Sequence, residues 1–227
     1  MYIITNMIIS LEGNIGSGKS TLYNYIKEQF SLCDNTINGK CIYFVEEPVD
    51  VWENIKDEEG NLIEHFYRNQ DKYSFCFQMA AYISRLAKLR NILKTAKEND
   101  IIITERCVFS DYNVFAKMLH DAGKINKIEF SCYNKWFDEF LDEIPAILFV
   151  YLKTSNENCY SRVLKRSRGG ENISKEYLQS CEKYHENWLQ KEKNKIILDG
   201  NLDTTYHREH LDTLKQTINS DNGEKKI

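Results

Sequence analysis

The sequence predicts an α/β fold, a five-stranded parallel sheet with helices on both faces. Five short, nearly continuous apolar runs are typical of strands that are buried on both sides, as in parallel sheets. Stretches with helical spacing of apolar residues separate these runs, which is the alternation expected of such a fold. The expected strands are residues 7–12, 41–45, 101–104, 146–152 and 196–198. Polar or charged residues follow each strand, and ligands of parallel sheets bind beyond the carboxyl ends of the strands.

A glycine-rich turn follows the first expected strand. Residues 13–20 read Gly-Asn-Ile-Gly-Ser-Gly-Lys-Ser and match the phosphate-binding pattern G-x-x-x-x-G-K-[ST]. A helix is expected over 20–30, where Leu22, Ile26 and Phe30 recur at helical spacing. Strand, turn and helix in this order predict a fold of the P-loop NTPase type. The alternative, a turn that only connects two elements, does not account for the lysine and the serine.

Each part of this turn has an expected role in binding a triphosphate. Its backbone amides and the positive end of the helix dipole face the phosphate oxygens. We expect Lys19 to reach the β- and γ-phosphates and the Ser20 hydroxyl to ligate Mg²⁺. The residues expected to bind the phosphates are Gly13, Asn14, Ile15, Gly16, Ser17, Gly18, Lys19, Ser20 and Thr21.

The later helices are expected from the spacing of apolar residues. The longest, over 73–97, carries a broad apolar and aromatic stripe, and Ser155 is a suitable N-cap for another. The other expected helices are 111–119, 126–141, 155–165, 174–190 and 204–218. We expect a single domain over residues 1–219, without repeats or linkers, and a flexible polar tail over 220–227.

Length and composition limit the classes of protein that fit. The chain of 227 residues accommodates one large domain or two small ones, and its net charge of −4 provides no global basic field for nucleic acid. Seven scattered cysteines without C-x-x-C pairs argue against a disulfide framework or a zinc site, and for a reducing compartment. No apolar run reaches the length of a membrane span, and the first strand begins too early for a leader peptide. We therefore expect a cytoplasmic protein that binds neither nucleic acid nor membrane.

Two expected strands end in acidic residues that suit phosphoryl transfer. Glu47 precedes Pro48, which favours an extended backbone and directs the carboxylate into the expected cleft. There it could accept the proton of a hydroxyl that attacks the γ-phosphate; an exposed acidic turn is the alternative. Glu105 follows another strand, where P-loop enzymes hold Mg²⁺, and Arg106 would face the transferred phosphoryl group. The alternative for these two residues is a surface ion pair.

A basic cluster precedes a pair of glycines. It consists of Arg162, Lys165, Arg166 and Arg168, and its first and third members lie one helical turn apart on a shared face. Guanidinium groups bind phosphate through two donors at once. We expect a mobile lid over 162–173 that brings these arginines over the phosphates and excludes water. The alternative is a solvated basic helix end that complements the helix dipole.

Aromatic residues gather near one amide. They are Tyr67, Phe75, Phe77 and Tyr82, and the amide belongs to Gln78. An aromatic slot with a glutamine suits a flat heterocycle, because the amide offers a donor and an acceptor to a base edge. A place in the core is the alternative for most of the rings. Gln78 is the exception, since a buried glutamine needs hydrogen-bond partners.

Together these motifs resemble the deoxynucleoside kinase family, which includes deoxycytidine and deoxyguanosine kinases. The similar segments are residues 12–21, Glu47-Pro48-Val49-x-x-Trp52, Phe77-Gln78 with Ser84-Arg85-Leu86, Glu105-Arg106-x-x-x-Ser110-Asp111, Arg162-x-x-x-Arg166-x-Arg168, and Tyr177-Leu178 with His185-Glu186-Asn187-Trp188-Leu189. They extend from about residue 7 to about residue 203. The resemblance implies a homodimeric enzyme that uses ATP and Mg²⁺ to phosphorylate the 5′-hydroxyl of a deoxynucleoside.

The resemblance also implies a role for each matching residue. Glu47 is the general base, Arg106 contacts the 5′ oxygen region, and Glu105 helps to hold Mg²⁺. The residues implied to bind the nucleoside are Gln78 at the base edge, Trp52 and Phe115 along the pocket, and Tyr67 and Glu171 at the sugar 3′-hydroxyl. The implied lid arginines are Arg166 and Arg168, and residues 199–203 fall where the family forms its loop around the ATP base.

Arg85 and Asp111 bear on the choice of substrate. In the family, such a pair accompanies deoxycytidine and purine deoxynucleosides, whereas members that accept thymidine carry smaller or apolar residues there. An Arg–Asp pair is a rigid polar wall that a 5-methyl group would have to displace. The resemblance therefore predicts deoxycytidine, deoxyadenosine or deoxyguanosine in preference to thymidine.

Two other functions remain open from the sequence. A nucleoside monophosphate kinase similar to thymidylate kinase shares the P-loop and the arginine lid, although its Glu-Pro is followed by glycine and not, as here, by Val49. A nucleotide-dependent switch would need a guanine-reading N-K-x-D. In this chain Asn134-Lys135-Trp136-Phe137-Asp138 places the aspartate one position too late.

Overall fold

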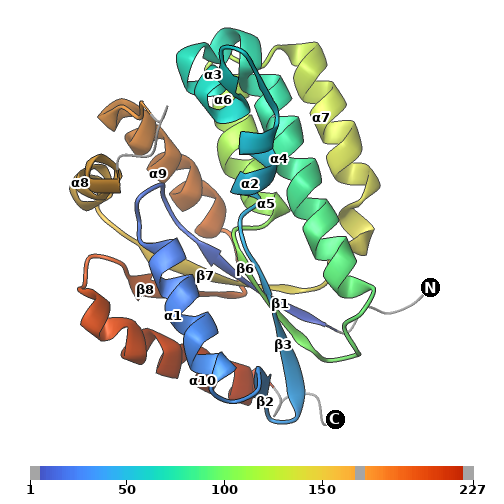
Figure 1. The fold of residues 1–227 in the computed structure, drawn as a ribbon, viewed down its shortest axis with the longest axis vertical. Coiled ribbons are helices and arrows are strands. Elements are labelled where there is room, and N and C mark those ends of the chain that lie inside the picture. Colours follow the sequence, from blue (N-terminus) through green and yellow to red (C-terminus); the bar gives the residue numbers. More distant parts are fainter. Residues whose placement is uncertain (1–5, 167–171, 222–227) are drawn as a thin grey trace.

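The computed structural model describes residues 6–166 and 172–221. Its centre is a six-stranded sheet in the order β2-β3-β6-β1-β7-β8 (Figure 1). The five parallel strands are β1 (Met7–Glu12), β3 (Lys40–Val45), β6 (Ile101–Glu105), β7 (Ile147–Lys153) and β8 (Lys195–Asp199). They confirm the predicted parallel sheet, with boundaries within one residue of those expected.

Short elements that the sequence did not predict flank this sheet. The two-residue strand β2 (Thr36–Ile37) pairs antiparallel with β3 and makes the sixth strand, and a hairpin joins β4 (Lys56–Asp57) to β5 (Gly60–Asn61). Along the chain, the short helix α2 (Val49–Asn54) precedes that hairpin and the short helix α3 (Leu62–Arg68) follows it. Segments of this length carry too few apolar residues to show a period.

Helices cover both faces of the sheet, as predicted. The long helices are α1 (Lys19–Ser31), α4 (Gln70–Leu93), α7 (Lys127–Glu139), α8 (Asn156–Arg166), α9 (Lys175–Leu189) and α10 (His207–Asp221). The last helix includes the first two residues of the predicted tail, 220 and 221, and residues 222–227 lie outside the described part of the chain. Two single 3₁₀ turns, Leu141–Glu143 and Thr204–Tyr206, complete the connections.

The predicted helix over 111–119 corresponds to two consecutive pieces in the structure, which a third short piece precedes. A single turn, α5 (Val108–Ser110), leads into the π-helix η1 (Asp111–Ala116), which continues as α6 (Lys117–Asp121). A π-helix carries an extra residue in each turn, and such insertions occur frequently at functional sites. Apolar spacing alone cannot distinguish this geometry from an α-helix.

Alternate residues of the central strand pack on opposite faces. Ile9 and Leu11 contact a cluster that α1 and α10 share, whereas Ile8 belongs to a second cluster with residues of α4, η1 and α9. Because both faces are covered, β1 reads as an apolar run. Helices α2, α3 and α6 stand above the sheet in Figure 1, on the side where β1 and β3 end. This arrangement encloses the space beyond the carboxyl ends of the strands.

Two findings bear on the expectations from composition. All seven cysteines are free thiols. Within residues 6–166 and 172–221, no helix combines the length and apolarity that crossing a membrane requires.

Candidate active site

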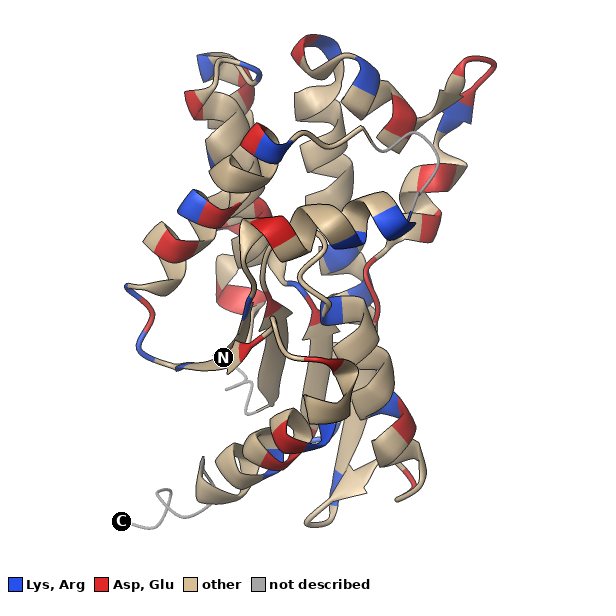
Figure 2. Cartoon of the chain, turned by 90° about the vertical axis from the view of Figure 1, so that its left-hand side faces the viewer, with Lys and Arg blue, Asp and Glu red and all other residues tan. Residues whose placement is uncertain are grey.

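A cavity of about 640 Å³ opens beyond the carboxyl ends of β1, β3 and β6. This volume lies in the range of ligand-binding pockets for small molecules. The predicted site residues that line it are Ile15 to Thr21, Glu47, Trp52, Tyr67, Gln78, Arg85, Glu105, Arg106, Asp111, Phe115, Arg162 and Arg166. In the view of Figure 2, basic and acidic segments are interspersed along the chain.

The P-loop connects β1 to α1 in the predicted geometry. Gly16 has a φ of +77°, and a Cβ at that position would meet the carbonyl oxygen of Cys159 on α8. Only glycine combines this backbone with so close an approach. Gly13 and Asn14 are not among the residues that line the cavity, and the Asn14 amide donates to the Leu178 carbonyl of α9 over 2.9 Å. The start of the loop is thereby fixed to a helix far along the chain.

Lys19 turns back onto the loop that precedes it. Its Nζ donates to the carbonyl oxygens of Gly13 (3.0 Å) and Asn14 (2.7 Å) and to Ser17 Oγ (3.3 Å). Burial lowers the pKa of Lys19 to about 7, and the nearby Arg106 adds to this effect. A triphosphate would provide the anionic partner that a buried ammonium group lacks in these contacts.

Ser20 and Glu105 meet at the edge of the cavity. Ser20 Oγ donates to Glu105 Oε1 over 2.6 Å, and Glu105 is buried at the end of β6. Glu105 and Arg106 are both buried, which contradicts the alternative that they form a surface ion pair. Arg106 pairs with the carboxylate of Glu47 and not with that of Glu105. No group of three His, Cys, Asp or Glu residues in the described ranges could hold a metal alone. A hydroxyl beside one carboxylate nevertheless suits Mg²⁺, which keeps several waters and takes phosphate oxygens as further ligands.

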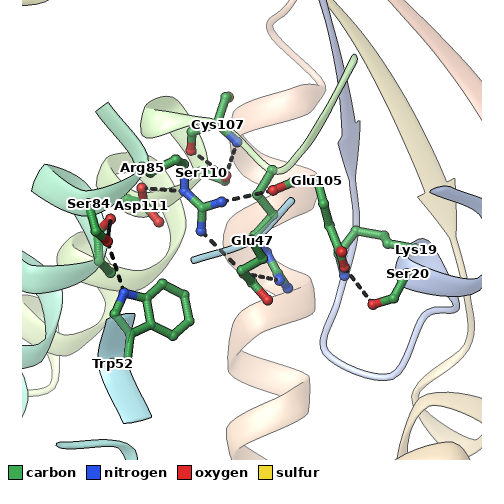
Figure 3. Close-up of polar contacts among 12 residues, drawn as sticks. Lys19, Ser20, Glu47, Trp52, Ser84, Arg85, Glu105, Cys107, Ser110 and Asp111 are labelled. Carbon is green, nitrogen blue, oxygen red and sulfur yellow. Dashed lines mark hydrogen bonds and ion pairs between the residues drawn. The ribbon is translucent and has the colours of Figure 1, made fainter. Parts of the chain in front are cut away.

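Glu47 lies inside the cavity wall rather than on an exposed turn. Its side chain is 18% exposed, whereas that of the preceding Glu46 is 58% exposed and pairs with Lys27. Oε1 of Glu47 accepts from Arg85 Nη2 over 3.2 Å (Figure 3) and from Arg106 Nη1 over 3.2 Å. Burial opposes ionisation, but Arg106, Arg85 and Lys19 lower the pKa of Glu47 to about 2. The carboxylate is therefore ionised at neutral pH.

The backbone of Arg106 directs its side chain into this cluster. Its φ of +61° is uncommon for a residue with a side chain, and such conformations gather at functional sites. The guanidinium group donates to the Gly13 carbonyl over 3.1 Å and lies 5.0 Å from the centre of the Phe115 ring. Arg106 thus joins the P-loop to Glu47 and to the wall of the pocket.

The opposite end of the cavity is aromatic around one amide. Gln78 is 2% exposed, and its Oε1 has no hydrogen-bond partner among the described residues. Trp52 donates from Nε1 to Ser84 Oγ over 3.0 Å and meets Phe77 edge to face, with ring centres 5.4 Å apart. Tyr82 is instead buried in the core, which is the alternative for that ring. An unpaired buried amide of this kind fits a ligand that supplies the missing hydrogen bond.

Arg85 and Asp111 form the predicted pair. Arg85 Nε donates to Asp111 Oδ2 over 2.9 Å, and both side chains are buried. Burial raises the pKa of Asp111, and Arg85 opposes that rise. The π-helix brings Asp111 and Phe115 to the same cavity, one turn apart.

Of the predicted lid over 162–173, residues 162–166 and 172–173 belong to the described part of the chain. Arg162 lines the cavity, but its Nη1 donates to the Ser17 carbonyl (2.8 Å) and the Gly200 carbonyl (2.9 Å), so it ties the P-loop to the loop after β8. Arg166 is the last residue of α8 and is exposed at the cavity rim. Arg168 and Glu171 lie outside the described residues.

Several residues in or beside the cavity have no role assigned from the sequence. Glu12 is fully buried at the end of β1, where Oε1 accepts from Ser10 Oγ (2.6 Å) and Cys107 Sγ (3.1 Å), and burial raises its pKa. His207 and His210 line the far end of the cavity from α10. Glu12 has a sequence signal, because an acidic residue directly before a glycine-rich turn lies at a strand end. The two histidines have none beyond helical spacing.

Known proteins are similar to this chain over most of its length. The family model described as deoxynucleoside kinase matches residues 9–221. A probable deoxycytidine kinase of Fowlpox virus is 40% identical over 190 residues, covering 82% of this chain and 72% of the relative. The deoxycytidine kinase of Homo sapiens is 33% identical over 203 residues, covering 80% and 74%. A mitochondrial deoxyguanosine kinase of Xenopus laevis is 28% identical over 214 residues, covering 85% and 76%.

Proposed function

The chain belongs to the deoxynucleoside kinase family, and from this premise we propose that it transfers the γ-phosphoryl group of ATP to the 5′-hydroxyl of deoxycytidine, deoxyadenosine or deoxyguanosine, in preference to thymidine. One observation carries the proposal. An ionised carboxylate, Glu47, is held beside a P-loop in a cavity whose other end presents an unpaired amide.

The residues around Glu47 divide the work of phosphoryl transfer. Lys19 and the amides of the P-loop bind the triphosphate, and Arg106 neutralises charge on the transferred group. Glu47 accepts the proton of the 5′-hydroxyl as that oxygen bonds to the γ-phosphorus, while the bond from this phosphorus to the bridging oxygen breaks and ADP leaves with the electron pair. Because its pKa is low, Glu47 is ionised and can accept a proton, but it is a weak base. A weak base suits a loose transition state, in which positioning of the reactants provides most of the acceleration. Mg²⁺, held through Ser20 and Glu105, would offset the charge of the phosphates.

The proposed base preference rests on three residues. The Gln78 amide offers a donor and an acceptor, which matches the N3 and amino group of cytosine and the N1 and amino group of adenine. Arg85 and Asp111 close the pocket beside it as a buried ion pair. A thymine methyl group pressed against this pair would displace a charged wall without replacing its hydrogen bonds.

Further parts of the proposal come from the family. We infer that Tyr67 and Glu171 bind the 3′-hydroxyl, that Trp52 and Phe115 hold the nucleoside, and that Arg162, Arg166 and Arg168 act over the phosphates. We also infer a homodimer in the cytoplasm that binds no nucleic acid. The net charge of −4 supports the last inference, because it provides no long-range attraction for a polyanion.

The structure does not favour the other two functions. The acceptor end of the cavity presents Gln78 and aromatic rings, which suit a base better than a second phosphate. Asn134, Lys135 and Asp138 lie on α7 and do not line the cavity, so they read no nucleotide bound there.

A direct assay tests the proposal. ATP consumption with Mg²⁺ is measured against the four deoxynucleosides, their ribose counterparts, and deoxycytidine monophosphate. We expect turnover with deoxycytidine or a purine deoxynucleoside and little with thymidine. Faster turnover of the monophosphate would favour a nucleoside monophosphate kinase instead.

A further inference from the structure

Arg85 contacts the two ends of the acceptor site at once. From α4 its Nε donates to Asp111 Oδ2 over 2.9 Å, its Nη1 donates to the Glu105 carbonyl over 2.8 Å, and its Nη2 donates to Glu47 Oε1 over 3.2 Å (Figure 3). The side chain is 5% exposed. Arg85 and Asp111 together form the proposed base-selecting wall. The planar guanidinium group of Arg85 therefore links this wall to Glu47, the carboxylate that takes the proton.

The contacts of Glu47 are one-sided. Both Arg85 and Arg106 donate to Oε1, and no described residue donates to Oε2. The Glu47 side chain lines the cavity and is 18% exposed. One oxygen of the carboxylate is clamped, and the other is free to accept a hydrogen bond from a substrate hydroxyl.

The two clamping arginines are held differently. Arg106 comes from the same strand end as Glu105 and is fixed by its own backbone and by the Gly13 carbonyl. Arg85 reaches Glu47 from a helix and is fixed by Asp111 and by the Glu105 carbonyl. A guanidinium group satisfies three such acceptors in one plane, which a lysine ammonium group cannot do.

We propose that Arg85 is a positioning residue for Glu47, through which Asp111 and the base-selecting wall orient the general base. This inference rests on the proposed function, because it assigns Glu47 the proton of the acceptor hydroxyl. It implies that the wall affects the rate of transfer as well as the choice of base. Substitution of Arg85 should therefore lower kcat and not only raise the KM for the nucleoside.

Charged groups approach Glu47 from four elements. They are Arg85 on α4, Arg106 after β6, Lys19 on α1 and Asp111 on η1. The adjacent Glu46 faces outward to Lys27. Removal of Arg85 takes away one of the three cations near Glu47, and an opposite charge at such a distance shifts a carboxyl pKa by about 1 to 3.

The test uses variants of Arg85 in the full chain. Arg85→Lys keeps the charge but loses the fork, and Arg85→Met loses both. Because Arg85→Met leaves Asp111 buried without its partner, Arg85→Met/Asp111→Ala removes the pair together and keeps the test valid if the single variant does not fold. Arg90→Met, five residues later on α4, is the matched control, since it removes an arginine from an exposed ion pair with Glu143.

Two measurements are made on each variant. The first is the ¹³C titration of the Glu47 carboxyl group in substrate-free protein, with its signal assigned by its loss in Glu47→Gln. The second is kcat and KM for deoxycytidine and for ATP. We expect the pKa of Glu47 to rise from about 2 into the range of about 3 to 5 in Arg85→Met/Asp111→Ala and to stay low in Arg85→Lys and Arg90→Met. We expect kcat to fall at least about tenfold in every Arg85 variant.

Two results would overturn the inference. One is a Glu47 titration that is the same in wild type and in Arg85→Met/Asp111→Ala. The other is a kcat within about twofold of wild type in the Arg85 variants, with the loss confined to the nucleoside KM. The titration needs no substrate, so it tests the effect of Arg85 on Glu47 even if the wild-type protein phosphorylates no nucleoside. A lack of phosphorylation would contradict the proposed function only.

Discussion

The two halves of the cavity are built differently. The donor half is one contiguous segment, the P-loop, in which Lys19 bonds to carbonyl oxygens only five and six residues before it. The acceptor half joins Glu47, Arg85, Arg106 and Asp111, whose contacts span 26 to 59 residues of sequence. Lys19 would have to exchange these internal contacts for a bound triphosphate, whereas the ion pairs of the acceptor half are already formed.

This difference has an energetic meaning. A buried ammonium group that contacts only neutral oxygens carries a desolvation cost, which a bound phosphate offsets. Buried carboxylates and guanidinium groups that already pair are costly to break, because each partner is left as an uncompensated charge. Substitutions should thus affect the two halves in opposite ways, with gains in stability on the donor side and losses on the acceptor side.

The largest expected effect is in the acceptor half. Glu47→Gln removes the proton acceptor, and kcat should fall by about 10² to 10⁴, the range typical of a lost general base. ATP binding, measured by calorimetry, should stay within about twofold of wild type. Glu46→Gln is the control, because it alters an exposed carboxylate one residue away. Full activity of Glu47→Gln would refute the assignment of the base.

Lys19 tests the donor half through its titration. Its folded-state pKa of about 7 lies below the ordinary value of 10.5, so between these values the folded protein binds fewer protons than the unfolded chain. The cost of burying the charge is thus fully present below pH 7 and is relieved as the pH rises towards 10.5. At about 1.4 kcal/mol for each pKa step of one, this cost is at most about 5 kcal/mol.

Urea denaturation between pH 6.5 and 9.5 measures the effect of Lys19. We expect wild type to gain stability relative to Lys19→Met as the pH rises, and Lys19→Met to be the more stable protein at pH 6.5. Lys27→Met, an exposed lysine on the same helix, should show the wild-type pH dependence. Parallel stability curves for wild type and Lys19→Met would show that the lysine is not desolvated in the substrate-free protein.

An intermediate effect is expected at Arg85 and Asp111, the proposed base-selecting wall. Arg85→Met/Asp111→Ala replaces a charged wall by apolar groups and makes room for a 5-methyl group. The ratio of kcat/KM for thymidine to that for deoxycytidine should rise by about 10- to 100-fold, as expected for the gain of one methyl contact and the loss of a clash. Arg90→Met should leave the ratio unchanged. A ratio within about twofold of wild type in the double variant would place base selection elsewhere.

The smallest effect is expected at the hydroxyl that joins the halves. Ser20→Ala removes the 2.6 Å hydrogen bond to Glu105 and should lower the stability of the substrate-free protein by about 1 kcal/mol. It should also raise the Mg²⁺ concentration needed for half-maximal activity. Ser31→Ala, at the exposed end of the same helix, serves as the control. An unchanged Mg²⁺ requirement would separate Ser20 from the metal.

The same contrast explains what could be predicted from sequence. The sequence predicts the five parallel strands and the long helices from the spacing of apolar residues, and the P-loop from its motif. Each of these patterns lies within a single segment of the chain. The β4–β5 hairpin, α2 and α3 escaped prediction, since they are too short to show a period. The π-helix over Asp111–Ala116 escaped it as well, because its extra residue leaves the apolar composition unchanged.

For some residues, the sequence predicts a place in the site but not all of the hydrogen-bond partners. Arg85 was expected only beside Asp111, and the structure adds Glu47 and the Glu105 carbonyl to its partners. A place over the phosphates stays a prediction for Arg162, and the structure adds that its guanidinium group ties Ser17 to Gly200. Hydrogen-bond partners so far apart in the chain follow from the packing of α4 and α8 against the sheet, which local patterns do not encode.

The sequence by itself determined the class of fold, the phosphate-binding loop and the identity of the acidic and basic side chains at the strand ends. Local backbone preferences and the pattern of apolar residues are sufficient for these, because they act over a few residues. The tertiary structure alone decided which charges face one another, and with them the low pKa of Glu47 and the raised pKa of Glu12. Charges interact through space, and burial strengthens that interaction, so both depend on how distant segments pack.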